Sequence, residues 1–185
     1  MALSRGDVLA KAVEILDAYG LADLTMRRLA TALGVQPGAL YWHYANKQEL
    51  LGAVTEHILS EVTAPAPGED WRGSLVSWSQ SLRAALLAHR DGAELASSAL
   101  ALSLGSLHPE EPLVQLLREA GIADPEASSV GATALHLTLG LAINEQSRAQ
   151  AVALGVLPGP AGDERDRLEL GIDLLARGVA ARFGI

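Results

Sequence analysis

One short segment of the sequence gathers side chains that could bind a nucleic acid. Residues 41–44, Tyr-Trp-His-Tyr, place four rings in a row, and the only charged residues between 24 and 48 are Arg27, Arg28 and Lys47. Arginine and lysine bind phosphate oxygens, while ring and polar side chains can reach base edges. The segment therefore predicts a nucleic-acid contact, although two adjacent arginines are also common on a solvated helix face.

The residues around this cluster predict two short helices joined by a tight turn. Thr25 is a suitable N-cap for a helix over 26–33 that ends at Gly34, and Pro37 suits the first turn of a helix over 37–43. These lengths are typical of a helix-turn-helix, whose second helix enters the major groove of DNA. Because helices this short must bury one face to be stable, we expect a set of apolar side chains to be core rather than contact residues. They are Leu29, Ala30, Leu33, Leu40 and Tyr44.

Helical spacing continues through the rest of the chain, which predicts an all-α fold. Ser4 and Asp7 form a capping box for a first helix that ends at Gly20, and Asn46 with Glu49 begins a helix through Val62. After a Pro/Gly break at 64–68, the spacing predicts helices over about 70–90, 91–104, 110–120, 125–153 and 163–183. A second linker is expected at 157–162.

Composition and charge indicate two functional parts. The chain has 185 residues, no cysteine and a net charge of −8. The first 50 residues carry five basic and five acidic side chains, so the remaining 135, with 9 basic and 17 acidic side chains, carry the whole imbalance. We expect a DNA-binding domain over 1–45, a connecting helix over 46–63 and a ligand-binding and dimerisation domain over 64–185. Without a signal peptide or a long apolar stretch, a cytoplasmic protein is expected.

A search for catalytic residues predicts no enzyme. The five histidines show no metal-binding spacing, and no nucleophile elbow, P-loop or dinucleotide-binding motif occurs. A helical small-molecule-binding protein or enzyme without operator binding remains the alternative. A helical interaction module would leave residues 24–48 unexplained.

Three stretches of the head carry a family resemblance. Residues 24–30 (Leu-Thr-Met-Arg-Arg-Leu-Ala), 33–35 (Leu-Gly-Val) and 40–51 (Leu-Tyr-Trp-His-Tyr-Ala-Asn-Lys-Gln-Glu-Leu-Leu) resemble the DNA-binding domain of the tetracycline-repressor (TetR) family. Residues 89–93 and 136–140 are similar to segments of the tetracycline repressor's regulatory domain. The resemblance implies a homodimer that binds double-stranded, palindromic operator DNA and that a small organic effector releases, with repression as the usual mode. It implies no contact with a membrane.

The resemblance also assigns DNA-contacting positions. They are Met26, Arg27, Gln36, Pro37, Gly38, Ala39, Tyr41, Trp42, His43 and Lys47. Residues 36–39 depart from the tetracycline repressor by losing polar groups that could reach base edges. A different operator sequence is therefore expected.

The effector pocket implied by the resemblance is largely apolar. Its positions fall on Trp78, Leu82, Ala96, Ala99, Leu113, Gly131, Leu135 and Asn144. Ala96 and Asn144 stand where the tetracycline repressor has a histidine and a glutamate that hold a magnesium–drug complex. Because magnesium prefers oxygen ligands, with carboxylates foremost, we expect no metal and no other cofactor. The expected effector is uncharged or weakly polar and largely apolar.

The dimer implied by the resemblance would form through the last two long helices. Their apolar residues at helical spacing are Leu135, Leu139, Ile143, Leu168, Ile172, Leu175 and Val179. Two heads that bind two half-sites together convert modest single-head affinity into specificity. The alternative is that these residues only fill the core of one protomer.

Overall fold

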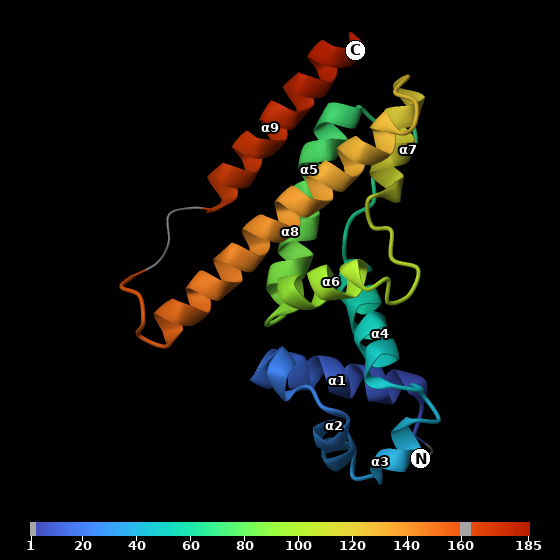
Figure 1. The fold of residues 1–185 in the computed structure, drawn as a ribbon, viewed down its shortest axis with the longest axis vertical. Helices are drawn as coiled ribbons and strands as arrows, with labels where there is room; N and C mark the ends of the chain where they lie inside the picture. The colour runs from blue at the N-terminus through green and yellow to red at the C-terminus, as the bar shows by residue number, and fades with distance from the viewer. Residues whose placement is uncertain (1–2, 160–163) are drawn as a thin grey trace. The chain divides into compact units, whose positions relative to one another are not determined.

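The chain forms helices and connecting turns throughout the part described. The computed structural model describes residues 3–159 and 164–185, and no strand occurs among them. Figure 1 shows the helices in chain order. They are α1 (Arg5–Tyr19), a 3₁₀ helix (Leu21–Asp23), α2 (Met26–Leu33), α3 (Pro37–Leu40), α4 (Lys47–Leu59), α5 (Trp71–Ala88), α6 (Gly92–Ala101), α7 (Glu111–Glu119), α8 (Glu126–Ala153) and α9 (Glu164–Phe183). The predicted all-α fold is confirmed.

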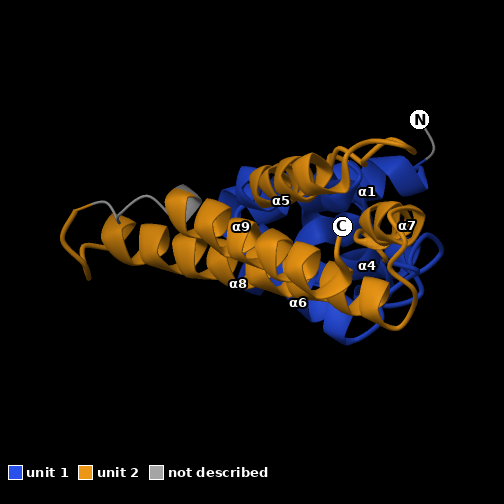
Figure 2. Ribbon diagram, turned by 90° about the horizontal axis from the view of Figure 1, so that it is seen from above, with its two compact units in different colours: residues 1–60, 86–107 blue, residues 61–85, 108–185 orange. Residues whose placement is uncertain are grey.

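The helices gather into two compact units, coloured in Figure 2. Unit 1 holds the chain up to Ser60 together with 86–107, and unit 2 holds 61–85 together with 108–185. Residues 86–107, which include α6, therefore belong with the N-terminal helices. The division into 1–45, 46–63 and 64–185 follows chain order and stays a prediction.

Local capping explains where the first helices of unit 1 begin. The Ser4 hydroxyl accepts the Asp7 N–H at 3.1 Å while the Asp7 carboxylate accepts the Ser4 N–H at 2.9 Å, so the predicted capping box of α1 is confirmed. Thr25 accepts the Arg28 N–H at 3.1 Å at the start of α2. Asn46 accepts the Glu49 N–H at 2.8 Å at the start of α4. These bonds satisfy N–H groups that have no partner inside the helix.

Helix α3 is shorter than predicted. It ends at Leu40, and the N–H groups of His43 and Tyr44 both bond to the Leu40 carbonyl at 2.9 Å. This shared acceptor closes the chain into a turn, so Tyr41, Trp42 and His43 project from a turn rather than from the predicted second helical turn. Similarly, α4 ends at Leu59 and α6 at Ala101, three residues before the expected ends.

Unit 2 is built on the long helices α8 and α9. Thr138, Leu139 and Ala142 of α8 are buried, as are Leu168 and Ile172 of α9. None of the helices in the described residues is long and apolar enough to span a membrane. Residues 160–162 of the second predicted linker, and Asp163 at the predicted start of the last helix, lie outside the described residues.

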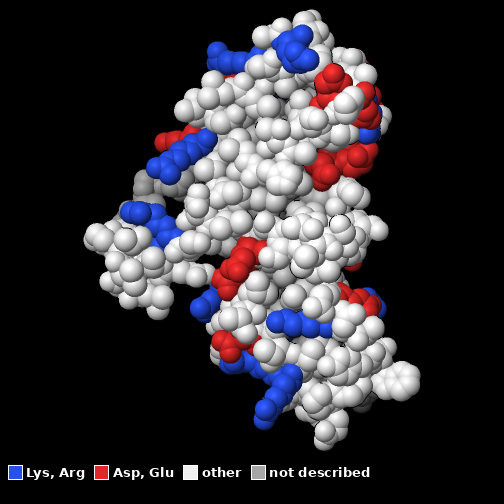
Figure 3. Space-filling view, viewed as in Figure 1, with Lys and Arg blue, Asp and Glu red and all other residues white. Residues whose placement is uncertain are grey.

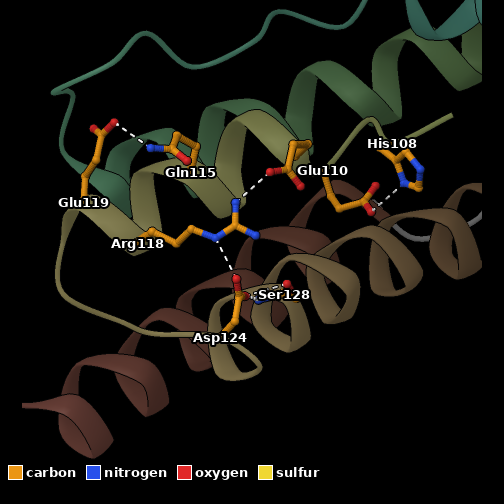
Figure 4. Close-up of polar contacts among 8 residues, drawn as sticks. His108, Glu110, Gln115, Arg118, Glu119, Asp124 and Ser128 are labelled. Atoms are coloured by element: carbon orange, nitrogen blue, oxygen red, sulfur yellow. Dashed lines mark hydrogen bonds and ion pairs between the residues drawn. The ribbon is translucent and has the colours of Figure 1, made fainter. Parts of the chain in front are cut away.

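An ion-pair cluster fixes the end of α7 to the start of α8 (Figure 4). The Arg118 guanidinium donates to Glu111 at 2.6 Å and to Asp124 at 2.9 Å, and the Ser128 hydroxyl donates to Asp124 at 2.7 Å. The Ser128 hydroxyl and then the Arg118 guanidinium hold the pKa of Asp124 below its ordinary value. The pair of carboxylates, Glu111 first, raises the pKa of Arg118.

The lowered pKa predicts how Asp124 affects stability against acid. A carboxylate whose pKa is lower in the folded chain stabilises the fold above its unfolded pKa, about 3.9, and loses that effect as the pH falls through the folded pKa. Asp124→Asn should therefore lower the thermal midpoint at pH 7, and the difference from the parent chain should shrink as the medium becomes strongly acidic. Thermal melts across this pH range measure it.

Asp173→Asn provides the matched control. Asp173 pairs with Arg177 one turn along α9 and both are exposed, so a much smaller effect is expected. A midpoint difference for Asp124→Asn that stays constant from neutral to strongly acidic pH would contradict the assignment.

Candidate nucleic-acid interface and effector site

The α2–α3 pair has the geometry of a helix-turn-helix. Gly34 adopts the left-handed conformation, with φ of 67°, and the Val35 N–H bonds back to the Ala30 carbonyl at 3.0 Å. A side chain there would be strained, which is why glycine suits the turn. Leu29, Ala30, Leu40 and Tyr44 are at most 1% exposed. These expected core residues hold the pair in place.

The predicted DNA-contacting residues all lie at the surface. Trp42 is 90% exposed and Tyr41 is 51% exposed. Arg27, Gln36, Pro37 and Gly38 are also exposed, and Met26, Ala39, His43 and Lys47 are partly so. A tryptophan this exposed leaves a large apolar ring in water, and conspicuously exposed apolar surface marks an interaction site.

Two of the three cations in this segment are available to a ligand. Arg28 pairs with Asp23 and lies over the Tyr19 ring at 3.8 Å. Arg27 and Lys47 form no ion pair with any residue that the structure describes. On the face seen in Figure 3, the surface over α3 shows no acidic side chain. The arrangement can bind phosphates through Arg27 and Lys47 and contact bases through the rings.

Arg5, which the sequence analysis did not single out, holds the exposed turn. Its guanidinium donates to the His43 carbonyl at 2.8 Å, pairs with Glu49 at 3.0 Å and lies over the Tyr44 ring at 4.2 Å. Glu49 in turn accepts the Ala45 N–H at 2.8 Å, and this bond and then Arg5 hold the pKa of Glu49 below its ordinary value. The network fixes both ends of the turn, so Arg5 is a positioning residue.

The connection between α5 and α6 holds the opposite end of α1. His89 lies 3.0 Å from the Asp17 carboxylate, and Asp91 accepts the Leu21 N–H at 2.8 Å. A side chain at Gly20 would place its Cβ 2.6 Å from the Asp91 carboxylate. Glycine is therefore required for this approach, and unit 1 links residues 89–91 directly to the helix that carries Arg5.

The predicted effector residues are nearly all packed inside the two units. In unit 2, Trp78, Leu82, Leu113 and Leu135 are at most 5% exposed. Gly131 is a contact point between α8 and α7, since an added Cβ would lie 2.4 Å from Val114. In unit 1, Ala96 and Ala99 of α6 are fully buried. Asn144 is exposed, and the pocket that the eight residues would form stays a prediction.

Most of the predicted dimer residues already pack within one chain. Leu135, Leu139, Leu168, Ile172 and Val179 are at most 5% exposed, which matches the alternative in which they fill the protomer core. Ile143 and Leu175 are partly exposed. The exposed apolar residues of α9 are two that the sequence analysis missed, Leu170 and Leu174, at 60% and 61% exposure. Their spacing of four residues was the available signal.

Comparison with known proteins gives the same answer for both halves of the chain. Residues 8–54 match the family model described as bacterial regulatory proteins, tetR family. Residues 64–156 match the model described as the tetracyclin repressor-like C-terminal domain. Tetracycline repressor protein class E of Escherichia coli is 37% identical over 151 residues, which cover 80% of this chain and 71% of the relative.

Solved structures agree over nearly the whole length. The crystal structure of BioQ from Mycobacterium smegmatis has a TM-score of 0.90 and 43% identity, covering 97% of this chain and 99% of that chain. A crystal structure of BioQ with its double-stranded DNA operator has a TM-score of 0.84 and 41% identity, with the same coverage.

Two substitutions should separate positioning from phosphate contact. Arg5→Met should weaken binding to a duplex that the chain shifts in a gel by about tenfold, the value of one charge-assisted hydrogen bond, and should leave the salt dependence unchanged. Arg27→Ala should weaken binding to every sequence alike and reduce the slope of log K against log salt by about one. Fluorescence anisotropy across a salt series measures both.

Lys11→Met is the matched control, because Lys11 is a cation of the same helix that pairs with Glu14. It should change neither quantity. A loss of slope in Arg5→Met equal to that in Arg27→Ala would show that Arg5 contacts phosphate itself.

Proposed function

Because this chain belongs to the TetR family of bacterial regulatory proteins and is a ligand-responsive DNA-binding transcriptional regulator, we propose that it is a repressor that a largely apolar effector releases from a palindromic operator. The observation that carries the proposal is the exposed Trp42 on a turn that Leu40 and Tyr44 anchor from below. BioQ is described in complex with a double-stranded DNA operator, and we extend that kind of partner to this chain. We also propose that the chain is not an enzyme and acts in the cytoplasm.

The proposal includes a homodimer formed by the outer faces of α8 and α9. Leu170 and Leu174 are exposed on α9, and Leu174 also borders an apolar hollow of about 340 Å³ lined by Val130, Val179 and Phe183. Two exposed leucines beside such a hollow form a surface that a second copy can cover. A dimer also places two heads on two half-sites at once.

Leu174→Asp should therefore give a monomer that binds operator DNA weakly. The charge would be buried without a partner in the dimer, at a cost of several kcal/mol, while it meets only water in the monomer. Sedimentation and a gel shift measure the two effects. Leu102→Asp is the control, since Leu102 is 66% exposed in unit 1. A stable Leu174→Asp dimer would refute this interface.

The effector part of the proposal assigns the ligand to the apolar residues of unit 2. Trp78 and Leu82 belong to α5, and the residues directly after α5 are those that hold the end of α1. A ligand that favours a changed position of α5 would favour a changed head, and operator affinity would fall by its preference between the two states. Neither Asn144 nor its neighbour supplies a free carboxylate, because Glu145 is paired with Arg83 at 2.6 and 3.0 Å.

A gel shift on the DNA upstream of its own gene tests the proposal. The chain should shift this DNA, and tetracycline with magnesium should leave the shift in place, because the donor set for the metal is missing. No shift would exclude operator binding and favour the alternative of a helical enzyme or binding protein. Release by tetracycline only when magnesium is present would overturn the metal-free effector site.

A further inference from the structure

A buried carboxylate oxygen in unit 2 lacks a hydrogen-bond donor. Glu110 precedes α7, and its Oε2 is buried without a partner among the described residues. The other oxygen, Oε1, lies 3.8 Å from the exposed His108 (Figure 4). Burying a carboxylate oxygen without a donor costs free energy, so a group that supplies a donor at Oε2 gains affinity without breaking an existing bond.

The surroundings of Glu110 join it to the residues assigned to the effector. The carbonyl of Pro109, the preceding residue, accepts the Trp78 indole N–H at 3.1 Å. On the α8 side, the Glu110 Cγ would lie 3.6 Å from a Cβ added at Gly131. One turn further along α7, Leu113 is fully buried. Three of the predicted effector residues therefore lie next to or along the chain from this one carboxylate.

No nearby cation neutralises the buried oxygen. Arg118, the arginine of α7, is engaged by Glu111 and Asp124. His108 faces Oε1 from the solvent side, with its side chain 73% exposed against 20% for Glu110. The interior side of the carboxylate thus presents negative charge to apolar neighbours, and such a site favours a cation attached to an apolar body.

We infer that Glu110 recognises the effector, and that the effector is an apolar molecule carrying one protonated amine. The inference rests on the proposed function and narrows it, since the sequence alone predicts an uncharged or weakly polar ligand. In the free chain Trp78 and Leu113 are packed, so the ligand must part them. The ammonium offsets part of that cost by donating to Oε2, which an alcohol does less strongly and a carboxylate cannot do.

The test uses matched probes on the full chain. Isothermal titration calorimetry compares 3-phenylpropylammonium with 3-phenylpropanol, which share the apolar body and differ in the charged donor. The parent chain should bind the ammonium at least ~10-fold more tightly than the alcohol, as expected for a charged hydrogen bond. Glu110→Gln should bind both with the alcohol's affinity.

Glu111→Gln is the matched control, because it removes the same charge one residue away from a side chain that pairs with Arg118. It should keep the preference for the ammonium. The thermal midpoint of ligand-free Glu110→Gln should not fall below that of the parent, since Oε2 makes no hydrogen bond to lose. A lowered midpoint would instead indicate a structural role and overturn the inference.

Binding of neither probe by the parent, equal binding of both, or a preference that survives in Glu110→Gln would also overturn it. Operator binding without any probe is measured on every variant in parallel. A gel shift that persists while the ammonium preference is absent refutes the Glu110 inference and leaves the proposed regulator intact. Loss of the shift in the parent chain refutes the proposed function itself.

Discussion

The DNA-reading segment of this protein is too short to hold its own shape, and the head is arranged around that constraint. Helix α3 has four residues, whereas an isolated helix needs roughly 12–15 to be even marginally stable in water. Burial of Leu40 and Tyr44 supplies what local hydrogen bonds cannot. Trp42 can remain 90% exposed because its neighbours on either side are anchored.

Helix α1 joins this anchor to the regulatory half of the chain. At its start, Arg5 bonds to the turn that carries Trp42. At its end, Asp17 contacts His89, and the Leu21 N–H just beyond it bonds to Asp91. A displacement of the residues after α5 therefore acts on the helix that positions the reading turn. The link needs no contact between distant side chains, because one stiff helix carries both attachments.

The sequence predicts what depends on neighbours in the chain. The starts of α1, α2 and α4 follow from Ser4, Thr25 and Asn46, because capping is local. The role of Arg5 could not be predicted, since its partners His43 and Glu49 lie 38 and 44 residues away.

Charge accounting explains why such a head works in pairs. Among the described residues, Arg27 and Lys47 are the cations of the reading segment that remain without an ion pair, so two heads neutralise about four phosphates and give a salt slope of about −4. A chain of net charge −8 gains little further attraction to DNA from its body. Affinity must then come from the rings of Tyr41 and Trp42 and from simultaneous binding of two half-sites. The apolar outer face of α9 is consequently as necessary to operator binding as the residues that touch the DNA.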